Sequence, residues 1–421
     1  MLDIKFIRQN PEIVKDGCKK KGFDVDIDRL LEVDKKRREV LKDLEEIRAQ
    51  KNKASKEIVK TKEEGKKKEI IEKMRELDKK EEKLSKTFKE LDREFKELML
   101  SVPNLPLEDV PVGKDDSENV VLREVGKKPQ FDFEPKDHLE IGEKLDIIDV
   151  KRAAKISGTR FGFLKNEAVL LEFALINFAF ENLIKEGFVP IIPPVLLREE
   201  MARGTGYFEA TDRQEAYFIP DDNLFLVGTS EQSLIAMHAN EIFEEKDLPK
   251  KYVGFSSCFR REAGSYGKDT RGIFRVHQFD KIEMIIFSKP EESRKWHQFL
   301  LQMQEKLMQA LEIPYRVVQI CTGDLGRPTA AKYDIEAWLP SQKRYRETHS
   351  TSNCTDFQAR RLNIKFKRKN GKLEFVHTLN GTALAIGRTI IAILENYQQK
   401  EGFVKIPKVL QKYLPFKEIK R

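Results

Sequence analysis

Two long runs of mainly apolar positions constrain the fold of this 421-residue chain more than any other feature. The runs occupy positions 30, 33, 37, 40, 44, 47, 51, 54 and 58, and positions 70, 74, 77, 81, 84, 88, 91, 95 and 98. Steps of three and four residues are typical of coiled-coil helices, and Gly65 lies between the two runs. The pattern therefore predicts an antiparallel hairpin of two helices, each roughly 35 residues and on the order of 50 Å long.

The predicted tip of this hairpin is basic. Eight lysines and three glutamates lie between Lys51 and Lys68, and the whole chain has a net charge of +8. A basic tip suits a phosphate backbone, although many coiled coils are rich in lysine for solubility alone. The candidate contacts to a nucleic acid are Lys51, Lys53, Lys56 and Lys60.

Composition predicts three parts. A short helical segment over residues 1–26, with a helix start at Asn10-Pro11-Glu12, precedes the hairpin, and together they make a first domain over residues 1–100. Residues 101–119 contain three prolines and cannot continue a helix, so they are expected to form a linker. Residues 120–421 mix short strands and helices and are expected to form a second domain.

Several classes of protein are disfavoured. The four cysteines are far apart, with neither zinc-ligand spacing nor a disulfide framework, which fits a reducing cytosol and predicts a cytoplasmic protein. The N-terminus is charged from its third residue, unlike a signal peptide, and no apolar run reaches membrane-spanning length. We therefore expect neither a zinc site nor a membrane partner.

The main candidate functional residues lie between Phe255 and Glu283. We interpret this stretch as two antiparallel strands joined by a basic loop with Gly264, Gly267 and Gly272. If the second strand begins at Ile273, alternation places five side chains on one face: Arg275, His277, Phe279, Lys281 and Glu283. Arginine forks match phosphate oxygens and an aromatic ring can cover a base, so this face suits a nucleoside triphosphate. The alternative is a solvated hairpin with a basic tip.

Three other stretches carry chemistry. Thr229-Ser230-Glu231 follows an apolar strand, where the carboxylate could pair with a substrate ammonium or the segment could simply cap a helix. Glu347 and Ser350 are hard oxygen ligands of the kind that Mg²⁺ prefers. Arg388 lies in a mostly apolar helix after a predicted turn at residues 380–381, and needs an anionic partner, which could be a phosphate or a nearby carboxylate.

The segment FRREAGSYGKDTRGIFRVHQFDKIE resembles motif 2 of the class II aminoacyl-tRNA synthetases, in the form found in seryl-tRNA synthetases. GFVPIIPPVLLREE, with its proline at Pro194, resembles motif 1, although it could be an ordinary strand entry, and residues 377–398 resemble motif 3. The helical hairpin resembles the tRNA-binding arm of the same family. The resemblance implies an α+β fold of the zinc-free, bacterial-like type, in which helices flank an antiparallel sheet and a coiled-coil hairpin precedes it.

The resemblance also implies a role for each matching residue. The catalytic residues would be Arg260, Arg275 and Arg388. The serine-binding residues would be Thr229, Ser230, Glu231, Arg260, Glu283, Asn380 and Thr382. The ATP-binding residues would be Arg260, Arg261, Glu262, Arg275, Val276, Phe279, Glu347, Thr348, His349, Ser350 and Arg388. Glu347 and Ser350 would hold Mg²⁺, the lysines of the tip would contact the tRNA of serine, and the region near Pro194 would form a homodimer.

The activity implied is activation of serine with ATP, followed by transfer of serine to tRNA; whether a selenocysteine tRNA is also charged stays open. One alternative is a threonyl or prolyl enzyme, and another is a carrier-protein ligase, but the hairpin argues against both. The last is a non-catalytic paralogue that binds RNA or a protein partner. Such a paralogue would have no need of Arg260, Glu283, Glu347 and Arg388, all of which are present.

Overall fold

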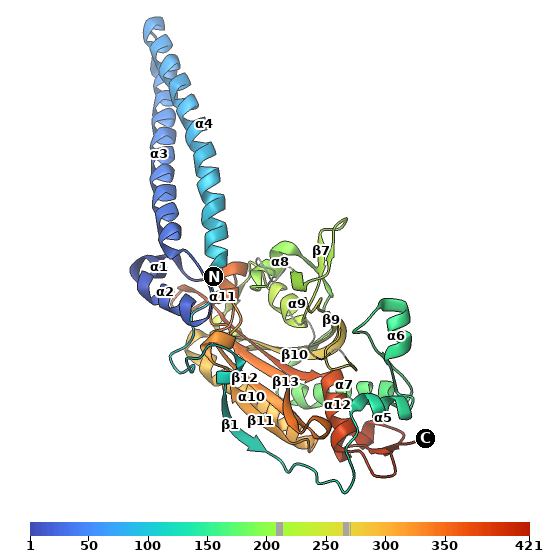
Figure 1. Cartoon of the computed structure of the whole chain (residues 1–421). Coiled ribbons are helices and arrows are strands. Elements are labelled where there is room, and N and C mark those ends of the chain that lie inside the picture. Colours follow the sequence, from blue (N-terminus) through green and yellow to red (C-terminus); the bar gives the residue numbers. More distant parts are fainter. Residues whose placement is uncertain (208–213, 264–268, 270) are drawn as a thin grey trace. The chain divides into compact units, whose positions relative to one another are not determined.

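A computed structural model describes residues 1–207, 214–263, 269 and 271–421 of the chain (Figure 1). These residues divide into two compact units. The smaller unit comprises residues 2–103, and the larger comprises residues 104–421 together with Met1. Among the described residues, no helix has both the length and the apolar character needed to cross a membrane.

The smaller unit is helical. It contains α1 (Ile4–Gln9), α2 (Pro11–Lys20), α3 (Ile27–Lys60) and α4 (Glu64–Ser101). The predicted helix start at residues 10–12 is confirmed, because α2 begins at Pro11. The predicted hairpin is confirmed as well, since α3 and α4 pack side by side (Figure 1). Residues 61–63 connect them, so Gly65 lies in the first turn of α4 and not in the connection.

The seam of the hairpin is narrow. Its buried apolar side chains include Leu30, Val33, Leu44 and Ile47 of α3, and Leu77 and Met99 of α4. The polar residues in the heptad runs find partners along this seam. Arg37 forms an ion pair with Asp92 at 2.7 Å, and Lys51 with Glu81 at 2.7 Å. Ion pairs therefore replace apolar contacts at several seam positions.

The larger unit is built on a sheet of eight strands (Figure 1). In spatial order these are β1 (Val120–Val125), β11 (Tyr315–Gln319), β12 (Ala331–Leu339), β13 (Arg344–Asn353), β16 (His377–Ala385), β10 (Gln278–Ser288), β9 (Lys250–Phe259) and β4 (Val189–Ile191). Neighbouring strands are antiparallel except β4 and β9. The predicted α+β class, with helices flanking an antiparallel sheet behind a helical hairpin, is confirmed.

Helices and smaller strands surround this sheet. The helices are α5 (His138–Lys144), α6 (Val150–Ser157), α7 (Glu167–Lys185), α8 (Glu199–Gly204), α9 (Ser230–Ala236), α10 (Ser293–Ala310), α11 (Phe357–Leu362) and α12 (Ile386–Asn396). The short 3-10 helices are η1 (Asp116–Glu118), η3 (Glu245–Asp247), η4 (Pro290–Glu292), η5 (Thr322–Asp324), η6 (Pro340–Gln342) and η7 (Lys408–Tyr413). The smaller strands are β2 (Ile148–Asp149), β3 (Phe163–Leu164), β5 (Leu196–Arg198), β6 (Phe218–Ile219), β7 (Leu224–Leu226), β8 (Ile242–Glu244), β14 (Lys365–Lys367), β15 (Leu373–Phe375), β17 (Val404–Lys405) and β18 (Glu418–Ile419).

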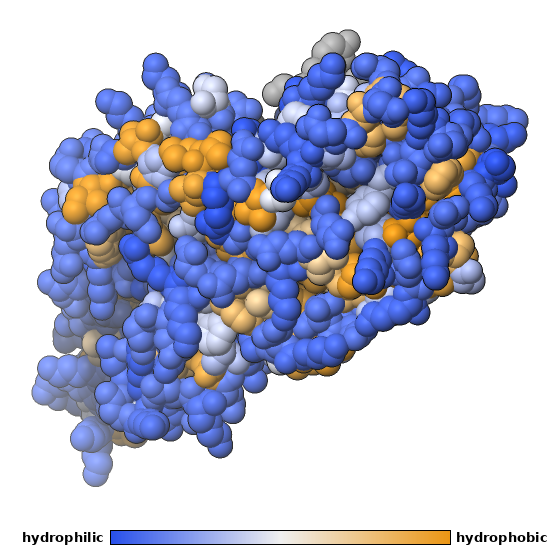
Figure 2. Space-filling view, turned by 90° about the horizontal axis from the view of Figure 1, so that it is seen from below, coloured by the Kyte–Doolittle hydropathy of each residue, from blue (hydrophilic) through white to orange (hydrophobic). Residues whose placement is uncertain are grey.

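Strand β10 separates two hydrophobic clusters. Ile282, Met284 and Ile286 point to a large cluster with residues of α7, α10 and α12, whereas Ile285 and Phe287 point to a smaller cluster with residues of α9 and α11. Because side chains alternate along a strand, Phe279, Lys281 and Glu283 near the beginning of β10 lie on the same side of the sheet as the smaller cluster. The space-filling view shows separate hydrophobic patches on a largely hydrophilic surface (Figure 2).

The position of several elements agrees with the sequence. The apolar helix ending before Gly187 is α7, and Gly187 adopts a φ of +83°, which favours glycine. The proline-rich segment forms an edge strand, because β4 with Pro190 lies at the border of the sheet. Residues 104–119 do not form a free tether: the Asn104 amide is buried and donates to Pro328 O (2.9 Å) and Cys354 O (2.8 Å).

Two local predictions are wrong. The strand expected from Ile273 begins only at Gln278, so Arg275 and His277 precede it and do not share its alternation. Residues 380–381 do not form the expected turn, because both lie inside β16. In the pairing with β10, Asn380 is opposite Ile285 and Gly381 is opposite Met284. A Cβ at Gly381 would lie 3.1 Å from Thr351 Oγ1, so this glycine serves close strand packing.

Candidate active site

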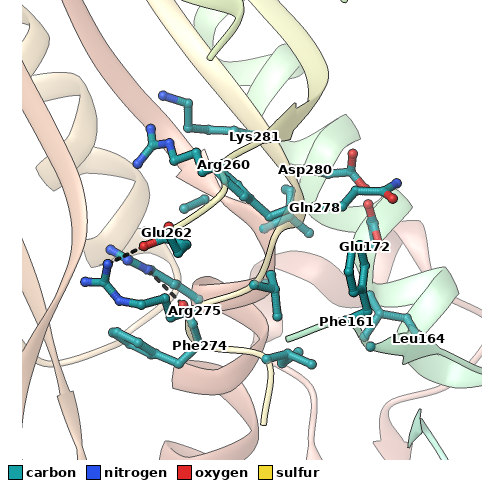
Figure 3. A pocket seen from close by; sticks show the side chains of 18 of the residues that line it. Phe161, Leu164, Glu172, Arg260, Glu262, Phe274, Arg275, Gln278, Asp280 and Lys281 are labelled. Atoms are coloured by element: carbon teal, nitrogen blue, oxygen red, sulfur yellow. Dashed lines mark hydrogen bonds and ion pairs between the residues drawn. The ribbon is translucent and has the colours of Figure 1, made fainter. Parts of the chain in front are cut away.

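A cavity of about 430 Å³ lies beside the beginning of β10 in the larger unit (Figure 3). The predicted site residues that line it are Arg260, Glu262, Arg275, Val276, Phe279, Glu347, Thr348, Ser350, Thr382 and Arg388. They come from the end of β9, the loop before β10, and strands β10, β13 and β16 with the first turn of α12. Residues far apart in the sequence therefore converge on one cavity, as the sequence-based hypothesis requires.

Arg388 closes one side of the cavity. Its guanidinium donates to Glu347 O (2.9 Å) and Phe274 O (3.3 Å), lies 4.6 Å from the centre of the Phe274 ring, and is 3.5 Å from Glu347 Oε1. Burial lowers the pKa of Arg388, while the Glu347 carboxylate opposes that shift. The sequence left open whether the partner of Arg388 is a phosphate or a carboxylate. In the structure a carboxylate partner is present, and it belongs to Glu347, the candidate magnesium ligand.

Arg260 and Arg275 have different local partners. Arg275 Nη1 pairs with Glu262 Oε2 at 2.5 Å (Figure 3). Arg260 Nε donates to Gly228 O at 3.1 Å, and its guanidinium lies 5.2 Å from the centre of the Phe279 ring. The described wall of the cavity therefore has three arginines and four phenylalanines, of which Phe279 is the one predicted from the sequence.

Glu347 and Ser350 lie three residues apart on β13 and both line the cavity. Burial would raise the pKa of Glu347, but Arg388, Lys332, Arg260 and Arg275 outweigh it and hold the pKa well below its usual range. The carboxylate is thus ionised at neutral pH, which a magnesium ligand must be. Among the described residues, no group of three or more His, Cys, Asp or Glu side chains could hold a metal ion.

Two buried carboxylates, Glu231 and Glu283, interact with Lys281 of the cavity wall but are not among the described residues that line the cavity. Glu231 is 3% exposed and Glu283 is 1% exposed. Lys281 Nζ forms an ion pair with Glu283 Oε2, and Thr382 Oγ1 donates to the same oxygen at 3.2 Å. Burial and the charge of Glu283 raise the pKa of Glu231 to about 7, against the opposing effects of Gln358, Lys281 and Tyr207.

Known proteins resemble both units. The family model described as "Seryl-tRNA synthetase N-terminal domain" matches residues 1–106, and the one described as "tRNA synthetase class II core domain (G, H, P, S and T)" matches residues 216–397. The serine–tRNA ligase of Dictyoglomus thermophilum is 48% identical over 423 residues, covering 100% of this chain and 99% of the relative. That of Caldicellulosiruptor saccharolyticus is 52% identical over 416 residues, covering 98% and 99%.

A solved structure agrees with this assignment. The crystal structure of seryl-tRNA synthetase from Pyrococcus horikoshii complexed with ATP matches with a TM-score of 0.91 and 45% identity, covering 100% of this chain and 99% of that chain. The chain belongs to the seryl-tRNA synthetase family. The family resemblance and the class II fold predicted from the motifs are both confirmed.

Within this family member, some predicted residues do not reach the cavity wall. The predicted site residues that are not among the described residues lining it are Arg261, His349, Thr229, Ser230, Glu231, Glu283 and Asn380. Thr229 caps α9 by accepting from Glu231 N at 3.2 Å, so the helix-cap interpretation of this segment is confirmed. The binding roles assigned to all the predicted site residues, on the wall or away from it, stay predictions.

His277 and the glycines of the loop need separate mention. The Nδ1 atom of His277 lies 2.9 Å from Arg260 O, and the centre of its ring lies 5.3 Å from that of the Phe161 ring. Gly264 and Gly267 lie outside the described residues, whereas Gly272 has a φ of +74°. The single polar face expected for the second strand is thus reduced to Phe279, Lys281 and Glu283.

Sequence reasoning did not single out three residues at the site. Tyr207 OH donates to Glu231 Oε2 at 3.0 Å, Gln358 Nε2 donates to Glu231 Oε1 at 2.9 Å, and Phe274 packs against Arg388. Tyr207 and Gln358 are 24 and 127 residues from Glu231, so no local pattern connects them. Phe274 is an apolar residue in a segment that was interpreted as a strand. The sequence therefore did not indicate that it lines the cavity.

The lysines of the hairpin tip differ from one another. Lys51 forms ion pairs with Asp78 (2.6 Å) and Glu81 (2.7 Å), so its ammonium is already neutralised. Lys53, Lys56 and Lys60 are exposed and form no ion pair with the residues that the structure describes. Of the four candidates, these three are better placed for a polyanion.

Proposed function

We propose that this protein is a serine–tRNA ligase, which activates serine with ATP and transfers it to the 3′ end of the serine tRNA. One observation carries the proposal: the described wall of a single cavity has three arginines, and its residue Lys281 interacts with two buried carboxylates, Glu231 and Glu283. Arginines suit the phosphates of ATP, and the carboxylates suit the ammonium and hydroxyl of an amino acid. Membership of the family, over the full length of its relatives, supports it.

For the nucleotide, we infer that the Phe279 ring stacks on adenine, with Glu262 and the Val276 backbone at its edge. Arg260 would hold the α-phosphate, Arg275 would assist, and Arg388 would hold the distal phosphates. In support, Arg260 lies over Phe279, so the α-phosphate of a stacked nucleotide would lie near this guanidinium. The ion pair of Arg275 with Glu262 would have to rearrange as the phosphates arrive.

The residue types at 347 and 350 fit a magnesium ion. Glu347 is ionised and half-exposed to the cavity, and the Ser350 hydroxyl also faces it. When bound, the ion would neutralise negative charge on the phosphates of ATP. Glu347 also orders the site by itself, since its backbone carbonyl accepts from Arg388.

For the amino acid, we infer that Glu231 and Glu283 bind the ammonium and side chain, while Thr382 reads the hydroxyl. The serine carboxylate would attack the α-phosphorus of ATP, forming seryl-adenylate as pyrophosphate leaves. A ribose hydroxyl at the tRNA 3′ end would then attack the seryl carbonyl, and AMP would leave. The protein side chains act by positioning and by stabilising charge, and no protein nucleophile is required.

Binding of tRNA would involve the basic tip of the hairpin, and assembly would involve the region near Pro194. The exposure of Lys53, Lys56 and Lys60 supports the first assignment. Exposed apolar side chains on α7 and beside Pro194 support the second: Phe173 is 59% exposed, Val189 53% and Ile192 81%. Light scattering on the purified protein would show whether its mass is that of a dimer.

Amino-acid-dependent exchange between ATP and pyrophosphate tests the catalytic part. The measurement needs no tRNA and is run with each of the twenty amino acids in the presence of Mg²⁺. Exchange with serine alone is expected. Exchange with threonine or proline instead would identify another class II enzyme, and no exchange from folded protein would favour the non-catalytic RNA-binding alternative.

A further inference from the structure

Lys281 is a buried cation that the proposed mechanism does not use. Its side chain is 9% exposed, and it extends from β10 in the same direction as Arg260 (Figure 3). A buried ammonium is costly unless it is paired, and Lys281 Nζ is paired with Glu283 Oε2. The same carboxylate oxygen also accepts from Thr382, so Glu283 is held by a charge and by a hydroxyl.

Glu231 is held differently, by neutral donors. Tyr207 OH donates to one oxygen and Gln358 Nε2 to the other. The orientation of the Gln358 amide is fixed, because its Oε1 accepts from Thr378 at 2.6 Å and its Nε2 also donates to Thr205 O at 2.8 Å. Within the part of the chain that the structure describes, Glu231 forms no ion pair.

The charges of this cluster do not balance without a ligand. Two buried carboxylates share one ammonium, so the cluster carries an excess negative charge whenever Glu231 is ionised, in a region from which water is largely excluded. The ammonium of an amino acid would neutralise that charge, and Arg260 could bind the carboxylate of the same amino acid. Without Lys281, a single ligand ammonium would meet two uncompensated carboxylates, and one of them would stay protonated instead.

We propose that Lys281 is a positioning residue for the amino acid: its ammonium neutralises Glu283, which leaves Glu231 as the carboxylate that receives the ammonium of the substrate. The proposal rests on the proposed function and assigns separate tasks to the two carboxylates. Glu283, held by Lys281 and Thr382, contacts the hydroxyl side of the ligand. The raised pKa of Glu231 agrees with a carboxylate that awaits a cation.

The other groups around Lys281 do not take over its role. Cys258 on β9 is a buried thiol whose pKa is raised by burial, and Arg260 at the end of β9 is directed to Gly228 and Phe279. Tyr207, Gln358 and Thr382 are neutral hydrogen-bonding groups. Among the described residues, the cation that pairs directly with this carboxylate cluster is therefore Lys281, and its partner is Glu283.

The test compares Lys281→Gln and Lys281→Arg with wild type in serine-dependent pyrophosphate exchange between pH 6 and pH 8.5. Lys281→Gln is expected to raise KM for serine about 10- to 100-fold at pH 7, to leave KM for ATP within about 2-fold, and to move the midpoint of the pH profile up by about 1–2 units. Lys281→Arg keeps the charge and should restore most of the affinity. The amine of free serine has the same pKa in every experiment. A difference between the pH profiles of the variants therefore reports on groups of the protein.

Lys289→Gln is the matched control. Lys289 directly follows β10 and pairs with Glu292 at 3.1 Å, but it is not among the residues that line the cavity. This variant should keep the wild-type pH profile. A Lys281→Gln variant that loses kcat with an unchanged pH midpoint would overturn the proposal, because Lys281 would then act on the reacting atoms. Equal losses in Lys281→Arg and Lys281→Gln would overturn it too.

Wild-type protein gives a second measurement that does not depend on a folded variant. Titration calorimetry of serine binding at pH 7, in two buffers of different ionisation enthalpy, counts the protons released. About half a proton should leave, as Glu231 ionises on meeting the ammonium. Binding without proton release would contradict the assignment of Glu231. Absence of any serine binding or exchange by wild type would instead refute the proposed function itself.

Discussion

The two units of the molecule differ in how they hold their charged residues. Helix α4 has 38 residues, and only Leu77 and Met99 are buried along it. Helix α12 has 11 residues and is buried over most of its length, yet it carries Arg388 into the cavity. Most charges on the hairpin are exposed to water, where each is worth little, whereas those around the cavity interact strongly in partial isolation from water.

This difference predicts where function is concentrated. In the sheet unit, loss of one charge leaves its partner uncompensated, so single substitutions should have large effects. On the hairpin, many exposed lysines act together on a distant polyanion, so each should contribute a small and salt-dependent share. The following substitutions test this contrast, from the largest expected effect on activity to the smallest.

Arg388→Ala should have the largest effect. It removes the guanidinium that faces the distal phosphates and leaves Glu347 without its nearest cation. Serine-dependent pyrophosphate exchange should fall by at least about 10³-fold, in the range seen when a single cation that stabilises phosphoryl transfer is lost. Circular dichroism and light scattering would show that fold and assembly persist.

Arg368→Ala provides the control for this substitution. Arg368 also pairs with carboxylates, Glu291 and Glu374, and lies 4.8 Å from the centre of an aromatic ring, that of Phe366. It is not among the residues that line the cavity, so exchange should stay within about 2-fold of wild type. Retained exchange in Arg388→Ala would show that the arginine of α12 is structural and that the nucleotide binds elsewhere.

Shortening the hairpin should separate the two half-reactions. The ion pairs Arg37–Asp92 and Arg48–Glu81 show which levels of α3 and α4 face each other, so residues 45–84 can be replaced by a short glycine linker. Exchange should remain near the wild-type rate, while aminoacylation of tRNA should fall on the order of 10²-fold, as contacts worth roughly 3 kcal/mol are lost. Equal loss of both activities would mean that the hairpin supports the sheet unit structurally.

Sequence reasoning was most successful where one local pattern sets the structure. The heptad runs placed α3 and α4, and the apolar run before Gly187 placed α7, because periodicity and a glycine stop are readable within each segment. It failed at Asn380-Gly381, a turn-like pair that strand pairing on both sides of β16 keeps extended. It also missed Tyr207 and Gln358, whose only link to Glu231 is the tertiary fold.

Neutralising the tip should give a smaller, graded effect. The triple variant Lys53→Gln, Lys56→Gln and Lys60→Gln should raise KM for tRNA about 10-fold and flatten the dependence of log affinity on log salt by roughly 2–3, one for each lost phosphate contact. Exchange without tRNA should not change. Lys51→Gln should do less than any of these three, since its ammonium is already bound to Asp78 and Glu81. An unaltered salt slope would show that the tip lysines serve solubility.

The smallest effect on activity is expected from His297→Gln, which instead alters acid stability of the sheet unit. His297 is buried on α10 and its Nε2 lies 3.0 Å from Thr351 O, so the neutral ring donates there. Burial lowers the pKa of His297 to about 4, against an ordinary value near 6.5. The unfolded chain therefore binds more protons than the folded one between these values, and stability is lost as pH falls below about 6.5.

The cost should reach about 2 kcal/mol at pH 5, and Gln, which keeps a donor but does not titrate, should escape it. We expect His297→Gln to melt below wild type at pH 7.5 and to approach or exceed it at pH 5, while exchange at pH 7.5 stays near wild type. The comparison of variant with wild type removes the opposing contribution of Glu231, whose raised pKa favours the folded state in acid. A melting difference that does not change with pH would show that His297 is not a titrating group, and acid sensitivity of the sheet unit would then have to come from other buried histidines, such as His349 and His377, whose pKa values burial also lowers.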